Sequence, residues 1–144
     1  MCVLIAGCQA PPFDRLREVL RQVCSQTLEA DTLADVGRIL RSRKDISVVF
    51  SAPTLKDASW RDVANLTRFS SQAPMLVLGV EGADPSTWTE LLENGGFGLC
   101  ASPWQPQTVR VTVQTAFRRW VRTAQIAEAR AENLRHIQSQ RYAS

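Results

Sequence analysis

The fold is decided by the stretch Asn94-Gly95-Gly96-Phe97-Gly98-Leu99-Cys100-Ala101-Ser102-Pro103-Trp104. Asparagine followed by two glycines is typical of a helix end, because these residues readily adopt the backbone conformation of a C-terminal cap. The apolar residues 97–101 are typical of a short buried strand, and Ser102-Pro103 favours a turn directly after it. The stretch therefore predicts a helix, a strand and a turn in close succession.

Working outward from this stretch, three further apolar runs are typical of strands that are buried on both faces. They are residues 2–6, 46–51 and 74–79. Four helices are predicted between the strands, because apolar residues recur there at steps of three and four. Each helix follows a start signal, either a proline in the first turn or a capping pair. These signals are Pro11-Pro12, Thr32 with Asp35, Ser59 with Asp62, and Asp84-Pro85.

A short segment at residues 27–30 separates the first two helices. Strand and helix thus alternate five times with short connections. Such alternation predicts an α/β fold with a doubly wound five-stranded parallel sheet, right-handed crossovers and helices on both faces.

Composition and charge exclude several classes of protein. A chain of 144 residues can bury one core without disulfides or a structural metal. It has no apolar span of membrane length and no basic leader at its start, so we expect a cytoplasmic protein that does not bind membranes. The four cysteines lack C-x-x-C spacing, and the only histidine, His136, lies in a polar tail. We therefore expect no metal and no cofactor.

A doubly wound sheet binds ligands at the carboxyl ends of its strands. The residues expected there include no acid, base or cation, so we expect the chain not to be an enzyme. They are Ala6-Gly7-Cys8-Gln9, Ser51-Ala52-Pro53-Thr54, Leu78-Gly79 and Ser102. Cys8 and Arg15 have C-x6-R spacing instead of the C-x5-R of cysteine phosphatases, and the intervening prolines remove backbone donors. We therefore interpret Cys8 as a packing residue.

The strand and helix alternation, its length to about residue 122 and the ending from Gly95-Gly96 to Pro103-Trp104 together resemble the receiver domain of bacterial response regulators. In that family the last strand is followed by Lys-Pro-Phe. Residues 56–63 also resemble the Pro-Asp-Gly-Ser-Trp-type segment of some receivers. The resemblance implies a flavodoxin-like, receiver-like domain over residues 1–122, a cis bond before Pro103, and a role in two-component signal transduction or a phosphorelay.

The resemblance also indicates which functional residues are missing. An active receiver holds Mg²⁺ between an acidic pair after the first strand and a phospho-accepting aspartate after the third. In this sequence the pair corresponds to Ala6 and Gly7, and the acceptor to Ser51 or Ala52, because Pro53 leaves the alignment open. The receiver's hydroxyl residue corresponds to Leu78 or Gly79, its switch aromatic to Leu99 and its lysine to Ser102. The resemblance thus implies a degenerate pseudo-receiver that works independently of phosphorylation.

The predicted last helix begins at Pro106 and continues past residue 122. Its apolar residues follow alternating steps of four and three, which is typical of a coiled-coil seam. They are Val113, Phe117, Trp120, Ala124, Ala127, Ala131 and Leu134. We expect residues 123–144 to extend this helix, and the chain to form a homodimer through the seam together with Trp88 and Trp104. The partner in a signalling pathway is unknown.

Two other functions are consistent with the sequence. Residues 118–144 carry six arginines and two glutamates, a net charge of +4. Pseudo-receivers occur in antiterminator proteins that bind RNA, so a nucleic-acid-binding regulator is the alternative, although few aromatic residues interleave with these arginines. The third hypothesis is a protein that binds a small molecule in the crevice at the strand ends. The sequence favours it least, because the Gly-rich loop that binds phosphate in such proteins is missing after residues 2–6.

Overall fold

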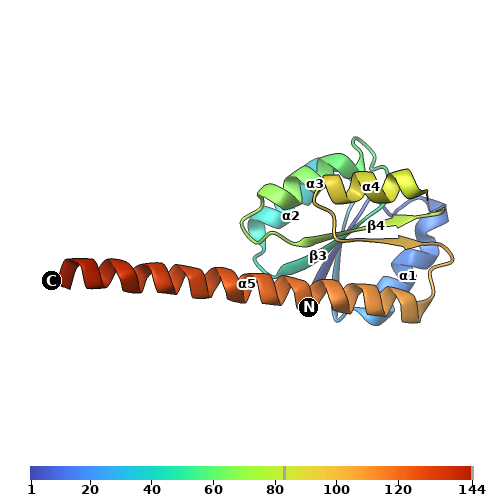
Figure 1. Cartoon of the computed structure of the whole chain (residues 1–144). Helices are drawn as coiled ribbons and strands as arrows, with labels where there is room; N and C mark the ends of the chain where they lie inside the picture. Colours follow the sequence, from blue (N-terminus) through green and yellow to red (C-terminus); the bar gives the residue numbers. More distant parts are fainter. Residues whose placement is uncertain (83, 144) are drawn as a thin grey trace.

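The computed structural model describes residues 1–82 and 84–143, and shows the doubly wound five-stranded sheet that the sequence predicts. All strand pairs are parallel, in the order β2-β1-β3-β4-β5 (Figure 1). The strands are β1 (Cys2–Ala6), β2 (Gln26–Ala30), β3 (Ile46–Ser51), β4 (Met75–Val80) and β5 (Gly98–Ala101).

Helices follow the strands at the predicted positions. After the short 3-10 turn η1 (Pro11–Phe13), they are α1 (Asp14–Val23), α2 (Leu33–Ser42), α3 (Trp60–Phe69), α4 (Pro85–Glu93) and α5 (Pro106–Ala143). Ser59 and Asp62 form the expected capping box at the start of α3. At the end of α4, Gly95 has a φ of +82°, and the N–H of Gly96 donates to the carbonyl of Leu91 at 2.8 Å. The paired glycines therefore end this helix as predicted.

Two layers of helices enclose the sheet. One buried cluster joins Val3, Val48 and Phe50 to α1 and α5. A second cluster joins Leu4, Val49 and Leu76 to α2, α3 and α4 on the other face. Alternate residues of the central strands thus enter opposite cores, and this double burial explains their continuous apolar sequence.

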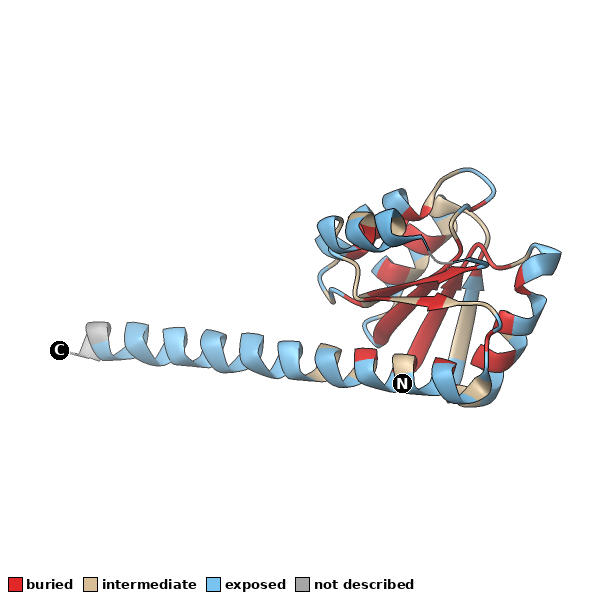
Figure 2. Cartoon of the chain, turned by 45° about the vertical axis from the view of Figure 1, so that its right-hand side comes forward, coloured by how far each residue is buried: buried red, intermediate tan, exposed pale blue. Residues whose placement is uncertain are grey.

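The helix α5 has two parts with different surroundings. Its first turns pack on the sheet through Val109, Val113 and Ala116, which are fully buried. Every position from 122 to 140 is exposed, and the helix extends alone beyond the domain (Figure 2). At 38 residues, it is about 57 Å long. Among the described residues, no helix combines the length and apolarity needed to cross a bilayer.

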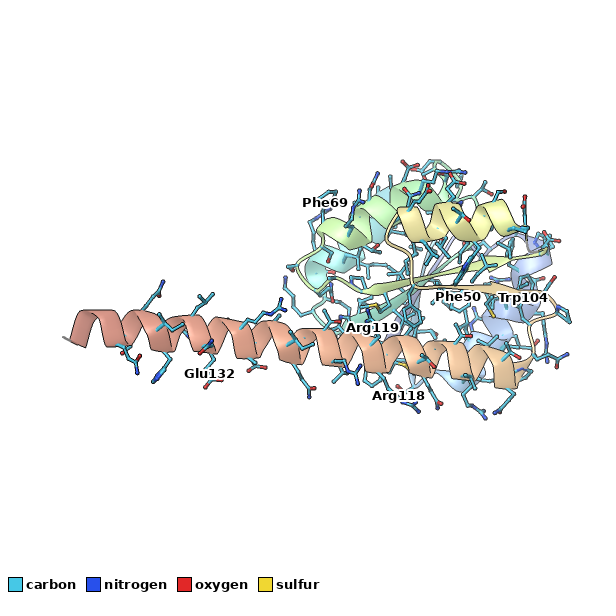
Figure 3. The ribbon with its side chains drawn as sticks, viewed as in Figure 1. Phe50, Phe69, Trp104, Arg118, Arg119 and Glu132 are labelled. Atoms are coloured by element: carbon cyan, nitrogen blue, oxygen red, sulfur yellow. The ribbon has the colours of Figure 1, made fainter. Side chains whose placement is uncertain are left out.

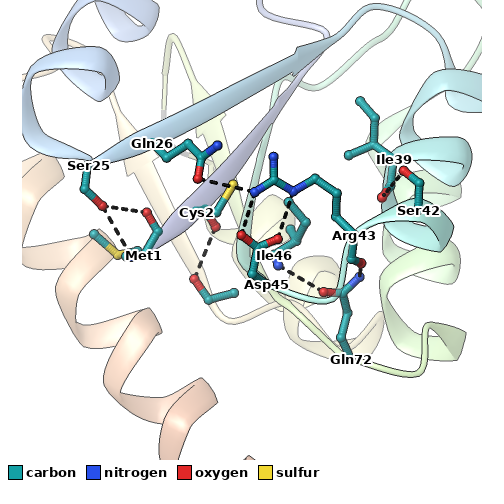
Figure 4. A network of polar contacts seen from close by, with 11 residues as sticks. Met1, Cys2, Ser25, Gln26, Ile39, Ser42, Arg43, Asp45, Ile46 and Gln72 are labelled. Carbon is teal, nitrogen blue, oxygen red and sulfur yellow. Dashed lines mark hydrogen bonds and ion pairs between the residues drawn. The ribbon is translucent and has the colours of Figure 1, made fainter.

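The point where α5 leaves the domain is fixed by Gln72, in the loop between α3 and β4. Its side-chain amide donates to the carbonyl of Arg43 at 2.6 Å and accepts from the N–H of Ile46 at 3.0 Å (Figure 4). The same amide donates to the carbonyl of Leu40 at 2.8 Å. Its backbone carbonyl accepts from the indole N–H of Trp120 at 2.8 Å. One residue therefore ties the end of α2, the start of β3 and the middle of α5 together.

Candidate functional site

The carboxyl ends of β1, β3, β4 and β5, here called the carboxyl edge, bring together most of the predicted site positions. Strand register places Ala6 beside Ser51, Ser51 beside Leu78, and Leu78 beside Leu99. The first three are fully buried and Leu99 is half-buried. This row of four neighbouring residues contains no charged group.

The loop between β3 and α3 closes over the start of the β1–α1 connection. Leu55 from this loop is buried, and Thr54 pairs with Ser59 in an isolated bridge that shapes the loop. Gly7 has a φ of +74°, and a Cβ there would lie 2.9 Å from the carbonyl oxygen of Thr54 and 3.0 Å from the Leu55 side chain. Both the backbone conformation and the close approach therefore require glycine. Leu55 and its backbone fill the space beside Gly7.

Cys8 lies next to this contact and is fully buried. Its thiol donates to the carbonyl of Ala6, with sulfur and oxygen 3.7 Å apart. Burial raises the pKa of the Cys8 thiol to about 12, and nearby Arg17 opposes that rise only in part. Because the thiolate is the reactive form of cysteine, Cys8 is held in its unreactive state.

The other cysteines are buried as well, and burial also raises the pKa of Cys24, to about 11, and those of Cys2 and Cys100. We expect the native chain to react with a thiol reagent at pH 8 far more slowly than an exposed cysteine. For Cys8, whose pKa is raised to about 12, the fraction of thiolate at pH 8 should be lower by about a thousandfold. The test compares reaction rates in buffer and in denaturant, where all four thiols react. Rapid labelling of one thiol in the folded chain would contradict the packing role.

The ends of β4 and β5 are also closely packed. A Cβ on Gly79 would lie 2.7 Å from Leu16 and 3.1 Å from Phe50, so a hydroxyl residue does not fit there without movement of the core. Ser102, at the position of the receiver lysine, donates its hydroxyl to the carbonyl of Glu81 at 2.6 Å. The peptide bond between Ser102 and Pro103 is cis. Ser102 thus joins two loops instead of offering a cation to a ligand.

Receiver chemistry depends on Mg²⁺ held by several carboxylates. Within residues 1–82 and 84–143, no three His, Cys, Asp or Glu side chains gather closely enough to hold a metal ion. The row at the carboxyl edge offers Mg²⁺ no carboxylate, and Ala52, the other candidate for the acceptor position, is buried too. The residues present do not fit a receiver-type magnesium site.

Two residues of the predicted interaction surface lie in the core instead. Trp104 is buried against Phe13, with ring centroids 5.4 Å apart, and its indole N–H donates to the carbonyl of Cys100 at 3.1 Å. Val113 is fully buried beneath α5. The prediction was wrong for both, because neither side chain is exposed: Trp104, in the connection between β5 and α5, packs on Phe13, and the sheet covers Val113 in the first turns of α5.

The other predicted surface residues are more accessible. Trp88 is 42% exposed on α4, and Leu134 is 60% exposed near the end of α5. Phe117 and Trp120 are half-buried and stack on each other, with ring centroids 6.3 Å apart. Ala124 and Ala127 are exposed beside Trp120, where they line a hollow with residues 71–73. The structure thus leaves the second half of the predicted seam uncovered.

Sequence reasoning missed the part played by Leu55. The only sequence signal for this role is that Leu55 is a large apolar residue in a loop. That signal does not predict the contact with Gly7. Sequence reasoning also gave no sign that the side chain of Phe69, at the end of α3, is 79% exposed.

Comparison by sequence finds no counterpart for this chain: no protein-family model matches it, and no curated protein does. Comparison by structure finds many. A signal receiver domain from Vibrio parahaemolyticus aligns with a TM-score of 0.72 and 13% identity, over 87% of this chain and 95% of its own. The signal receiver domain of an HD domain-containing protein from Pseudomonas fluorescens Pf-5 aligns with a TM-score of 0.72 and 17% identity, over 86% and 91%.

A third similar structure, adenylate cyclase from Rhodopirellula baltica, aligns with a TM-score of 0.73 and 12% identity, over 93% of this chain and 96% of that one. Identities this low support a shared fold and no finer relationship. The chain therefore has the flavodoxin-like fold of signal receiver domains.

Proposed function

We propose that the chain is a cytoplasmic pseudo-receiver that takes part in two-component-type signal transduction without phosphorylation, as a module for dimerisation and protein interaction. It catalyses no reaction and uses no cofactor. The observation that carries this proposal is the carboxyl edge, where Ala6, Ser51 and Leu78 form a buried uncharged row and Leu55 fills the space beside Gly7. Without carboxylates and a lysine, nothing there would stabilise the charge of phosphoryl transfer.

The second half of α5 supports dimerisation. Leu134, on the predicted seam, is 60% exposed although it has a large apolar side chain, and Ala124, Ala127 and Ala131 of the same seam are exposed as well. Most of the stability of a protein helix comes from packing of its apolar side, and this part of α5 has no such packing against the rest of the described chain. A second copy of the same helix would provide that surface.

We expect the chain to be insensitive to phosphoryl analogues. Addition of beryllofluoride with millimolar Mg²⁺ should change neither the thermal unfolding temperature nor the sedimentation coefficient, because the row Ala6, Ser51, Leu78 and Leu99 offers neither of them a carboxylate. An active receiver domain treated in parallel is the control. A stabilisation that requires both additives would contradict phosphorylation independence.

Nucleic-acid binding is the alternative function, and one observation favours it. Arg118, Arg119 and Arg122 line a common hollow beside Phe97. If this surface binds RNA, the affinity falls steeply with salt and falls again when the three arginines are replaced with glutamine. The pseudo-receiver proposal predicts no such salt-dependent binding.

A further inference from the structure

A groove lies between α2 and α3, far from the carboxyl edge. It has a volume of about 400 Å³. Leu40, Leu66 and Phe69 give it an apolar lining, and Arg41 and Lys44 stand at its border. None of these residues belongs to the predicted receiver site or to the seam of α5.

Phe69 is the most exposed large apolar side chain among those described, at 79%. It is the last residue of α3 and lies at the outer end of that helix (Figure 3). The guanidinium of Arg68 lies 5.1 Å from the centre of its ring. The core gains nothing from an aromatic ring in this position, whereas aromatic and arginine side chains together are typical of binding hot spots.

Gly37 keeps the groove open. It lies in the middle of α2, where glycine destabilises a helix by about 1 kcal/mol relative to alanine. A Cβ at this position would lie 3.1 Å from the guanidinium of Arg41 and 3.8 Å from Leu66. The Arg41 side chain is flexible enough to move, so the packing of the fold does not require glycine here. The missing side chain instead leaves space inside the groove.

The groove is also cationic. The residues that line it include Arg41 and Lys44 and, within the described chain, no carboxylate. Arg41, Lys44 and the adjacent Arg68 take part in none of the ion pairs between described residues. A ligand that buries apolar groups between these three charges would be held more strongly if it carried carboxylates.

We propose that the groove between α2 and α3 binds an amphipathic helix of a partner protein. Its apolar residues would contact Leu66 and Phe69, and its acidic residues would face Arg41 and Lys44. A second copy of this chain fits less well, because its exposed helix is itself basic, with net charge +4 over residues 118–144. A nucleic acid fits less well too, since three large apolar side chains line the groove. The inference rests on the proposed function and names the chemistry of its partner.

Fluorescence anisotropy with the full chain tests this inference. The probe is a labelled helical peptide of about 15 residues, with leucines at steps of three and four and glutamates elsewhere. The matched peptide carries lysines in place of the glutamates. We expect the acidic peptide to bind with a dissociation constant of tens of micromolar, about tenfold or more tighter than the lysine peptide.

Substitutions in the groove test whether the acidic peptide binds there. Replacing both Arg41 and Lys44 with glutamate, or Phe69 with alanine, should weaken binding of the acidic peptide at least about tenfold. Gly37→Ala should weaken binding while the unfolding temperature stays the same or rises, because alanine favours the helix. Leu92→Ala, which removes another exposed apolar side chain from α4 on the same side of the sheet, is the control and should bind as the parent does.

Three results would overturn the proposal. The two peptides could bind equally well, the variants could bind like the parent, or the groove could prefer single-stranded RNA in the same assay. A loss of self-association in the Phe69→Ala variant would also overturn it, by assigning the groove to a second copy. Peptide binding and dimerisation are measured separately, so a monomeric chain that still binds the acidic peptide contradicts only the proposed dimer.

Discussion

Replacing Ser51 with aspartate should lower the free energy of unfolding by about 3 kcal/mol at pH 7 instead of creating a phosphorylation site. Ser51 is fully buried between Ala6 and Leu78, and its hydroxyl already donates to the carbonyl of Ala52 at 2.8 Å. A carboxylate in its place would have no cation or metal beside it. Burial would therefore raise the pKa of the new carboxyl group in the folded state.

The pH dependence follows from that shift. A carboxyl group whose pKa is higher in the folded than in the unfolded state destabilises the fold only where the unfolded chain ionises. The loss should therefore be large at pH 7 and shrink as the pH falls towards about 4. Urea unfolding at several pH values measures it.

Ser51→Asn is the matched control, because asparagine has nearly the size of aspartate and no charge. Its loss of stability should not depend on pH. Millimolar Mg²⁺ should rescue neither variant, since the aspartate variant would supply only one of the three carboxylates that a receiver uses. If Mg²⁺ restored the stability of Ser51→Asp, the carboxyl edge would retain a metal site and the pseudo-receiver proposal would fail.

Most of the fold could be predicted because its signals are local. The buried strands at 2–6 and 46–51 are continuous apolar runs, and Ser59 with Asp62 marks the start of α3 from residues three apart. The segment at 27–30 gave a weaker signal. As β2 it lies at the edge of the sheet, where Gln26 and Glu29 are exposed, so its sequence lacks the apolar run of a central strand.

The candidate site was only partly predictable. The absence of carboxylates at the receiver positions Ala6, Gly7, Ser51 and Ala52 can be read from the sequence, since each position is counted from a strand end. The packing that takes the place of the carboxylates cannot be read from the sequence, because the whole sheet brings Gly7 and Leu55 together.

The stripe on α5 was ambiguous for a related reason. Steps of three and four describe both a helix packed on its own sheet and a helix paired with another copy. Val113 belongs to the first kind and is fully buried, whereas Leu134 is 60% exposed and still unpartnered in the single chain. The sequence pattern alone does not say where one role ends and the other begins.

The exposed half of α5 leads to the second prediction: the full chain should sediment as a dimer, and a chain ending at Arg122 as a monomer. A single substitution, Leu134→Glu, should have nearly the same effect. Burying a leucine contributes about 2 kcal/mol, and a symmetric dimer buries two, so the dissociation constant should rise by about a thousandfold. Sedimentation equilibrium over a range of concentrations measures that change.

Ala129→Glu is the matched control. It adds the same charge to the same exposed segment, but at about 3.6 residues per turn it lies on the side of the helix opposite Ala127, Ala131 and Leu134. It should remain a dimer. Both variants should unfold at the parent temperature when the chain is dilute enough to be monomeric, because positions 129 and 134 are exposed and lie beyond the part of α5 that borders the domain. A full chain that is monomeric at all concentrations would contradict the coiled coil, and the basic helix would then have to be tested as a binding surface for another molecule.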